Sequence, residues 1–144
     1  DFGRSILTFR GKQYMNDVFS KHGEAGGQYT YPSQIDFMRE QKRKVIEPNY
    51  HFDLCRLSMT ILEELNYSKY HDYKDNQGLI DFLYSMTIGE NDLRIYELED
   101  NFDMYVAIAK YSNNALPLDI IQNDIFRQFR IKKKNFPKKL YYHL

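Results

Sequence analysis

The segment that decides the fold runs from Phe52 to Leu65 and reads FDLCRLSMTILEEL. Drawn as a helix, it carries apolar side chains around its whole circumference rather than along one stripe. A helix that is apolar on all sides is typical of the centre of a folded core. Pro48 and Asn49 precede it and suit the start of a helix. We therefore predict a buried central helix over residues 51–66.

Three further helices are predicted downstream from their apolar periodicity. They span Gln77–Ile88, Phe102–Asn113 and Pro117 to about Phe129. Proline is favourable in the first turn of a helix, which places the start of the last helix at Pro117. The polar, tyrosine-rich segment 67–76 is predicted to be a loop. The predicted fold class is mainly α, with one core built around the central helix.

Residues 1–49 have a different composition, rich in Gly, Pro, Ser and charged residues. The apolar run Ile6–Phe9 predicts a short extended segment, followed by a long irregular loop. Gly23, Gly26 and Gly27 permit backbone conformations that other residues resist. Loops of this length are usually functional or disordered.

The 20 basic and 20 acidic side chains cancel, so the total charge does not predict a polyanionic partner. Cys55 is the only cysteine, which excludes an internal disulfide, and with no secretory segment we expect an intracellular, cytoplasmic setting. No apolar run approaches the roughly 20 residues of a membrane span, so no membrane partner is expected. The four histidines lack the spacing of a zinc site. Because the chain begins at Asp1 without Met, we expect a fragment.

Four sequence motifs follow one another in a suggestive order. Asp-Phe-Gly stands at 1–3, GGQYTYP at 26–32, the central helix opens with Phe52-Asp53, and DIIQNDIF closes the last predicted helix at 119–126. This order resembles the protein kinase superfamily. In that family a metal-binding Asp-Phe-Gly opens the activation segment, which ends at a Tyr-x-x-Pro-like turn. A buried helix that opens with Asp follows it, and the resemblance covers nearly the whole chain.

The resemblance implies a role for each residue of these motifs. Asp1 would bind the Mg²⁺ that bridges the phosphates of ATP, because hard cations prefer carboxylate oxygen. Phe2 would pack between the two lobes, and Gly3 would let the activation segment change conformation. The activation segment itself would run from Arg4 to Gln28. No residue of this chain would be the catalytic base.

The same resemblance assigns the substrate floor and the central helix. Gly27, Gln28, Tyr29 and Pro32 would form the surface on which a peptide substrate lies. Asp53 would be structural, accepting backbone N–H bonds from the catalytic loop, since a buried carboxylate without partners costs several kcal/mol. The alternative for Asp53 is an ordinary acidic residue in a helix's first turn, where it favours the helix dipole.

Several positions depart from the family pattern. Ser33 stands where the family usually has Glu, and its usual Arg partner is missing near Asn114. Losing both members of a buried pair leaves no unpaired charge, whereas losing one would cost roughly 3–5 kcal/mol. Ser58 replaces the usual Gly of the central helix and Cys55 its Trp. The substrate-floor Thr is absent at Gly26-Gly27, which weakens any assignment of peptide specificity.

We therefore expect the C-terminal lobe of a divergent Ser/Thr-type protein kinase. Residues 1–33 would hold the Asp-Phe-Gly motif and activation segment, 34–131 the helical lobe and 132–144 a basic tail. Mg²⁺ and ATP would be cofactors of the full-length parent, and its partners a protein substrate and the N-terminal lobe. This chain lacks the Gly-rich loop, the nucleotide Lys and the His-Arg-Asp loop, so alone it should be inactive. The alternatives are a pseudokinase lobe that acts as a binding or scaffold module, or an unrelated helical protein.

The basic end of the chain allows a second hypothesis. From Ile125 to Leu144 there are seven cations and no acid. With aromatic residues between the lysines, this tail could bind nucleic acid or an acidic partner. The alternative is a solvated terminus, or one folded back on the acidic segment Glu90–Asp103. The Tyr-rich, Trp-free composition is similar to that of kinase-like proteins of large DNA viruses, which would place the parent in host cytoplasm.

Overall fold

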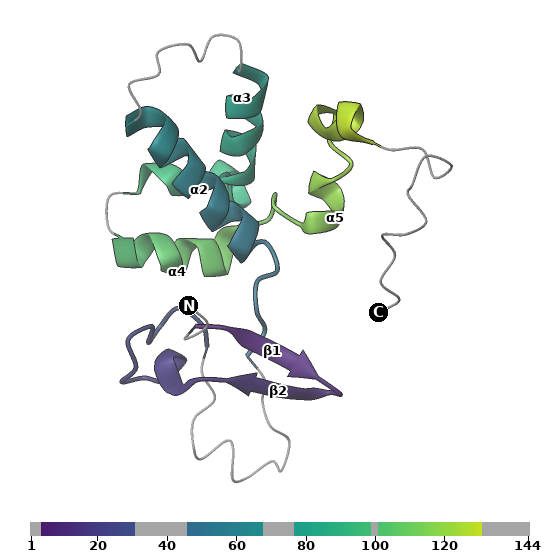
Figure 1. Cartoon of the computed structure of the whole chain (residues 1–144). Coiled ribbons are helices and arrows are strands. Elements are labelled where there is room, and N and C mark those ends of the chain that lie inside the picture. The colour runs from purple at the N-terminus through teal and green to yellow at the C-terminus, as the bar shows by residue number, and fades with distance from the viewer. Residues whose placement is uncertain (1–3, 31–45, 68–76, 99–100, 131–144) are drawn as a thin grey trace.

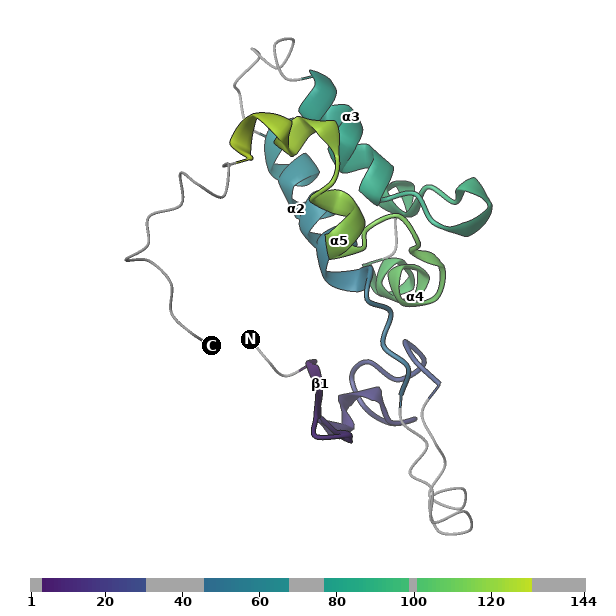
Figure 2. The same ribbon diagram turned by 90° about the vertical axis from the view of Figure 1, so that its right-hand side faces the viewer.

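A computed structural model describes residues 4–30, 46–67, 77–98 and 101–130. Helices dominate this part of the chain, together with one small two-stranded sheet, which agrees with the expected mainly α class (Figure 1). The helices are α2 (Phe52–Tyr67), α3 (Gln77–Met86), α4 (Asn101–Tyr111) and the short α5 (Pro117–Ile120). The hairpin and its loop lie at one end of the helical part, near the start of α2 (Figures 1 and 2).

The main core forms where α2 packs against α3 and α4. Cys55, Met59 and Leu62 project from one side of α2 and are almost fully buried. Two short 3-10 helices, η3 (Glu90–Asp92) and η4 (Ile95–Glu97), connect α3 with α4. The predicted central helix is thus confirmed in position, and the other buried members of its core come from the surrounding helices and their connections: Phe82, Leu83, Met86, Ile95, Met104, Ala107, Ile108 and Ala115.

Burial around the whole of α2 was predicted, and that prediction is wrong. Leu57 is 51% exposed and Ile61 36% exposed, and both lie on the side that also carries the exposed Asp53 and Glu64. The physical reason is that α3 and α4 cover one side of α2, and the described residues do not bury the other. Some apolar residues of α2 therefore lie outside the core that the described residues form.

The predicted helix from Pro117 to Phe129 is not continuous. After α5 the chain turns, and a separate 3-10 helix, η5, runs over Asp124–Phe129. Asn123 causes the restart, because its side-chain oxygen accepts a hydrogen bond from the backbone N–H of Ile125 at 3.0 Å. This local cap competes with continued helix, as short polar side chains often do. Pro117 does occupy the first turn of α5, as predicted.

The extended segment predicted at Ile6–Phe9 is strand β1, but the sequence analysis missed its partner. Strand β2 (Lys12–Met15) pairs with β1 in antiparallel register, with Ile6 opposite Met15. The two-residue turn between them has positive φ at both positions, 50° at Arg10 and 73° at Gly11. That geometry matches the right-handed twist of a hairpin. A region predicted as irregular therefore begins with a regular hairpin.

A second, smaller core lies beneath the hairpin. Asn16 caps the 3-10 helix η1 (Asp17–Phe19), and Phe19 packs with Ala25 and Ile46. The carboxamide of Gln13 accepts a bond from the backbone N–H of Ile46 at 3.0 Å and donates one to its carbonyl at 2.8 Å. The side-chain amide of Gln13 thereby satisfies both backbone polar groups of Ile46, as a neighbouring strand would. Residues far apart in the chain are held together by this pair of bonds.

Several predictions fall on residues outside the described ranges. They concern Asp1, Phe2 and Gly3, Pro32 and Ser33, most of the 67–76 loop, and the basic tail 132–144. Within the ranges that the structure does describe, no helix is long and apolar enough to cross a bilayer.

Candidate functional site

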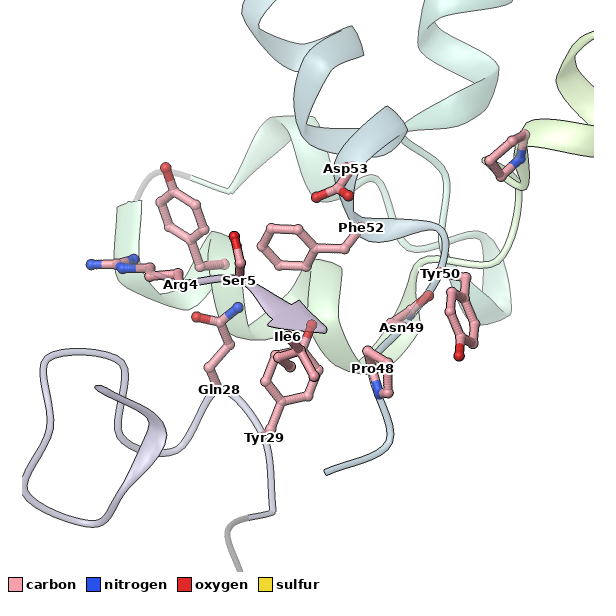
Figure 3. A pocket seen from close by; sticks show the side chains of 12 residues that line it. Arg4, Ser5, Ile6, Gln28, Tyr29, Pro48, Asn49, Tyr50, Phe52 and Asp53 are labelled. Carbon is pink, nitrogen blue, oxygen red and sulfur yellow. The ribbon is translucent and has the colours of Figure 1, made fainter. Parts of the chain in front are cut away.

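A pocket of about 480 Å³ lies between the hairpin and the helical part of the molecule. Five parts of the chain line it: the residues at the start of β1, the loop at Gln28 and Tyr29, the residues at the start of α2, and one residue each of α4 and α5 (Figure 3). Two of the motifs singled out in the sequence, Gln28-Tyr29 and Asp53, therefore meet here. Arg4 and Ser5, which follow the Asp-Phe-Gly motif directly, join them. The pocket is the candidate functional site of this chain.

Tyr29 fixes one wall of the pocket. Its ring meets Phe19 edge-on, with 5.2 Å between the ring centroids. Burial raises the pKa of the Tyr29 hydroxyl. Its hydrogen bonds with the backbone of Asn49 and with the side chain of Gln28 lower this pKa and offset part of the effect. The negative charge of Asp53 raises this pKa further. The tyrosine thus stays neutral at ordinary pH and ties the end of the loop to the start of the helical part.

Gln28 is the least satisfied polar group of the site. It is only 3% exposed, and its Oε1 has no hydrogen-bond partner among the described residues. The preceding residue, Gly27, has φ of 90°, a conformation that strongly favours glycine and that turns the chain at this point. A buried oxygen without a donor is costly, typically by about 1–3 kcal/mol. Gln28 therefore keeps an unsatisfied acceptor that is buried behind the wall of the pocket.

Asp53 lies in the first turn of α2, and the structure leaves it exposed at the pocket. Figure 3 shows its carboxylate above the ring of Phe52. Phe52 in turn stacks on Tyr105 of α4, with 6.2 Å between centroids. The described residues do not bury Asp53 as its expected structural role requires.

Cations gather around Tyr105 at the edge of the pocket. The guanidinium of Arg4 lies 5.6 Å from the ring centroid and that of Arg56 lies 5.5 Å from it. Arg56 also donates from Nε to the Tyr105 hydroxyl at 3.4 Å and forms an ion pair with Glu63 at 3.6 Å. The ring of Tyr105 therefore contacts both Arg4, which lies just before β1, and Arg56 of α2.

The approach to α2 is organised by Asn49, whose importance the sequence did not reveal. Its side-chain nitrogen donates to the carbonyls of Ile108, Ala109 and Ser112 at 3.2, 3.2 and 2.9 Å. Its oxygen accepts from the backbone N–H of His51 at 2.9 Å. Asn49 was predicted only as a residue suited to a helix start. It also caps the far end of α4, and nothing in the local sequence signals that contact.

His51 makes a second link of the same kind. Its Nδ1 accepts a hydrogen bond from the backbone N–H of Ala115 at 2.8 Å, which joins the start of α2 to the segment before α5. Burial lowers the pKa of His51, and the carboxylate of Asp119 partly opposes this shift. The neutral imidazole is thus the form that the fold requires, because a protonated Nδ1 cannot accept a bond.

Three positions that depart from the kinase pattern have clear structural roles. Ser58 is buried and its hydroxyl donates to the carbonyl of Leu54 at 2.8 Å. Cys55 is also buried, and burial raises the pKa of its thiol, so it serves the core rather than chemistry. Asn114, near the position of the missing Arg, donates to the carbonyl of Ile88 at 3.2 Å. Each of these side chains therefore serves the packing or the hydrogen bonding of this fold.

The pocket does not hold a metal ion with the described residues alone. Among them, no group of three His, Cys, Asp or Glu side chains could hold one. Asp53 is the only carboxylate among the described residues of the pocket wall. A Mg²⁺ ion bound here would need ligands beyond these residues.

Comparisons of the chain with protein-family models, with curated proteins and with solved structures found no match.

Proposed function

We propose that this chain is the C-terminal lobe of a divergent Ser/Thr-type protein kinase. Its full-length parent would transfer the γ-phosphate of ATP to a protein hydroxyl. One observation carries the proposal: Arg4 and Ser5, Gln28 and Tyr29, and Asp53 line a single pocket. These segments correspond to the start of the activation segment, its end, and the acid that opens the central helix. Their meeting supports the resemblance, since proximity in space was not used to identify the motifs.

The free acceptors at the pocket support the same reading. The Oε1 of Gln28 lacks a donor, and the carboxylate of Asp53 is exposed. In a kinase the catalytic loop supplies backbone N–H groups to the acid of the central helix, and this chain has no such loop. An added segment that donates to Asp53 would satisfy this carboxylate and shield it from water. The pocket would then be a contact surface for the rest of the parent.

The residues of this chain would contribute positioning rather than proton transfer. Tyr29, held by Phe19 and the Asn49 backbone, would give the peptide substrate a rigid floor. Asp53 would fix the catalytic loop, and Arg4 on Tyr105 would fix the start of the activation segment. Asp1 fits a Mg²⁺ site by the chemistry of its carboxylate, and the bound ion would offset charge on the transferred phosphoryl group.

The decisive experiment measures phosphoryl transfer by the full-length parent with Mg-ATP and a generic protein substrate. Asp1→Asn should lower the rate about 100-fold or more, because a metal ligand contributes several kcal/mol and each ~1.4 kcal/mol is tenfold. Asp92→Asn is the matched control, since Asp92 is exposed in η3 and asparagine tolerates its positive φ. That variant should keep full activity.

The isolated chain provides the complementary test. It should show no turnover above its own Asp1→Asn variant, because nucleophile and phosphates have nothing to position them. Turnover by the isolated chain would overturn the proposal. A folded parent that does not transfer phosphate would favour the pseudokinase alternative instead.

A further inference from the structure

The hairpin has two chemically different faces. Ile6 and Met15 point to the small core and pack against it. The alternate residues form what we name the outer hairpin face, made of Leu7, Phe9, Lys12 and Tyr14. Leu7 is opposite Tyr14 and Phe9 is opposite Lys12, so the four side chains lie on one side of the sheet. The outer hairpin face does not line the pocket described above.

Three large apolar side chains of the outer hairpin face are exposed. Leu7 is 60% exposed, Phe9 56% and Tyr14 47%. Three large apolar side chains on two four-residue strands form a contiguous patch, and exposed patches of this kind often mark interaction sites. The described residues do not cover it.

The charged residues of the hairpin sequence have one sign. Residues 4–16 contain Arg4, Arg10 and Lys12 and no acid. The guanidinium of Arg10 lies 5.2 Å from the centroid of Phe9, and the ammonium of Lys12 lies 5.0 Å from that of Tyr14. Each of these two rings therefore has a cation over one of its faces, which leaves the other face for a stacking partner. The hairpin is a cationic and aromatic surface on a chain whose net charge is zero.

We propose that the outer hairpin face binds single-stranded nucleic acid. Aromatic rings on an open sheet offer stacking platforms to unpaired bases, and nearby cations neutralise the phosphates. Phe9 and Tyr14 are diagonal neighbours across the two strands, so successive bases could stack on them while Arg10 and Lys12 meet the backbone. This inference concerns a different surface from the pocket and does not depend on the proposed kinase function.

Two other anionic partners fit this surface less well. A peptide rich in carboxylates would match the cations, but the faces of aromatic rings are negative and do not attract carboxylates. An anionic bilayer would favour apolar residues at the tip of the hairpin. Here the tip is Arg10-Gly11, and the apolar side chains lie along the strands. Nucleobases differ from both because they offer π-faces to the rings and phosphates to the cations.

The test uses the full 144-residue chain and a fluorescent oligothymidylate or oligouridylate, with binding followed by anisotropy at low and moderate salt. The wild type should bind, more weakly as salt rises. Phe9→Ala and Tyr14→Ala should each weaken binding roughly 5- to 150-fold, because stacking contributes about 1–3 kcal/mol per base. Arg10→Gln combined with Lys12→Gln should reduce the salt slope by about 1.4, since each phosphate contact contributes about 0.7 for a single strand.

Matched controls are available on α4. Tyr111→Ala and Lys110→Gln remove an exposed ring and an exposed cation from outside the hairpin and should leave affinity unchanged. Circular dichroism would verify that every variant is folded. Loss of binding after truncation at Ile131, with Phe9→Ala and Tyr14→Ala unchanged, would assign the affinity to the tail and overturn the proposal. Binding to phosphatidylserine vesicles without oligonucleotide binding would overturn it as well.

Discussion

The side-chain amide of Asn49 donates a hydrogen bond to the backbone carbonyl of Ser112 at 2.9 Å, so the start of α2 holds the end of α4. The last carbonyls of a helix have no partner within the helix and need one from elsewhere. In this fold a residue 63 positions earlier in the chain supplies it. The same side chain accepts from the backbone N–H of His51, so both ends of its amide are used.

Replacing Asn49 should therefore destabilise the fold. Asn49→Ala removes two N–H donors that are shared by three carbonyls, and one acceptor, and we expect a loss of about 1–3 kcal/mol in the free energy of unfolding. Urea unfolding followed by circular dichroism would measure it. Asn114→Ala is the control, because Asn114 is exposed and makes a single bond of 3.2 Å. Equal losses in the two variants would contradict the special role of Asn49.

The lowered pKa of His51 predicts a pH dependence of stability. Its ordinary value is 6.5, and burial lowers it in the fold. Below about pH 6.5 the unfolded chain therefore takes up the proton more readily than the folded chain. The stability that the neutral His51 contributes is present above that pH and is lost as the pH falls through the lowered pKa.

Urea unfolding at pH 7.5 and pH 5.5 would test the contribution of His51. The wild type should lose more stability between the two conditions than His51→Gln, whose amide oxygen can accept from Ala115 without titrating. His22→Gln, at an exposed histidine, should behave like the wild type. A pH dependence that is unchanged in His51→Gln would show that other groups cause it.

The same substitution, glycine to alanine, should destabilise the fold at one position and stabilise it at another. Gly11→Ala places a side chain at φ of 73° in the hairpin turn, which should cost about 1–2 kcal/mol. Gly78→Ala lies in α3, where an added Cβ meets nothing within 4 Å, and should stabilise by roughly 0.5–1 kcal/mol. Thermal melts of the two variants would measure the difference. A neutral Gly11→Ala would mean that the turn does not hold its positive φ in solution.

Asp53 should matter more in the parent than in the isolated chain. In the chain it is exposed, so Asp53→Ala should remove only a favourable helix-end charge, about 0.3–1 kcal/mol. In the parent the loss should reach a few kcal/mol if the catalytic loop donates its N–H groups to this carboxylate. Thermal melts of both proteins, each with and without the substitution, give the comparison. Equal losses would favour the ordinary helix-end role.

The sequence predicted the helices well and their surroundings less well. Apolar periodicity located α3 and α4, and the dense apolar content of residues 52–65 located α2, in each case within two residues at both ends. It could not show that α2 would be covered on one side only, since that depends on where the neighbouring helices lie. Strand β2 was missed because KQYM mixes polar and apolar residues, and Arg10-Gly11 is a weaker hairpin signal than Asn-Gly.

The candidate site was predictable only in part. Gln28, Tyr29 and Asp53 were named from the kinase resemblance, and all three line the pocket. The long-range contacts of Asn49, His51 and Tyr105 were not predicted, because their partners lie 49 or more positions away and leave no local pattern. The orphan oxygen of Gln28 depends on packing, so only coordinates could reveal it.

The paired hydrogen bonds between Gln13 and Ile46 make this part of the chain a natural place for protein engineering. They hold together two points that are 33 residues apart in the chain. Because the cost of closing a loop grows by only about 0.6 kcal/mol for each doubling of its length, these two points should stay together when residues are added between them. An epitope tag or a small reporter domain inserted between residues 34 and 45 would test whether the hairpin and the helices keep their places.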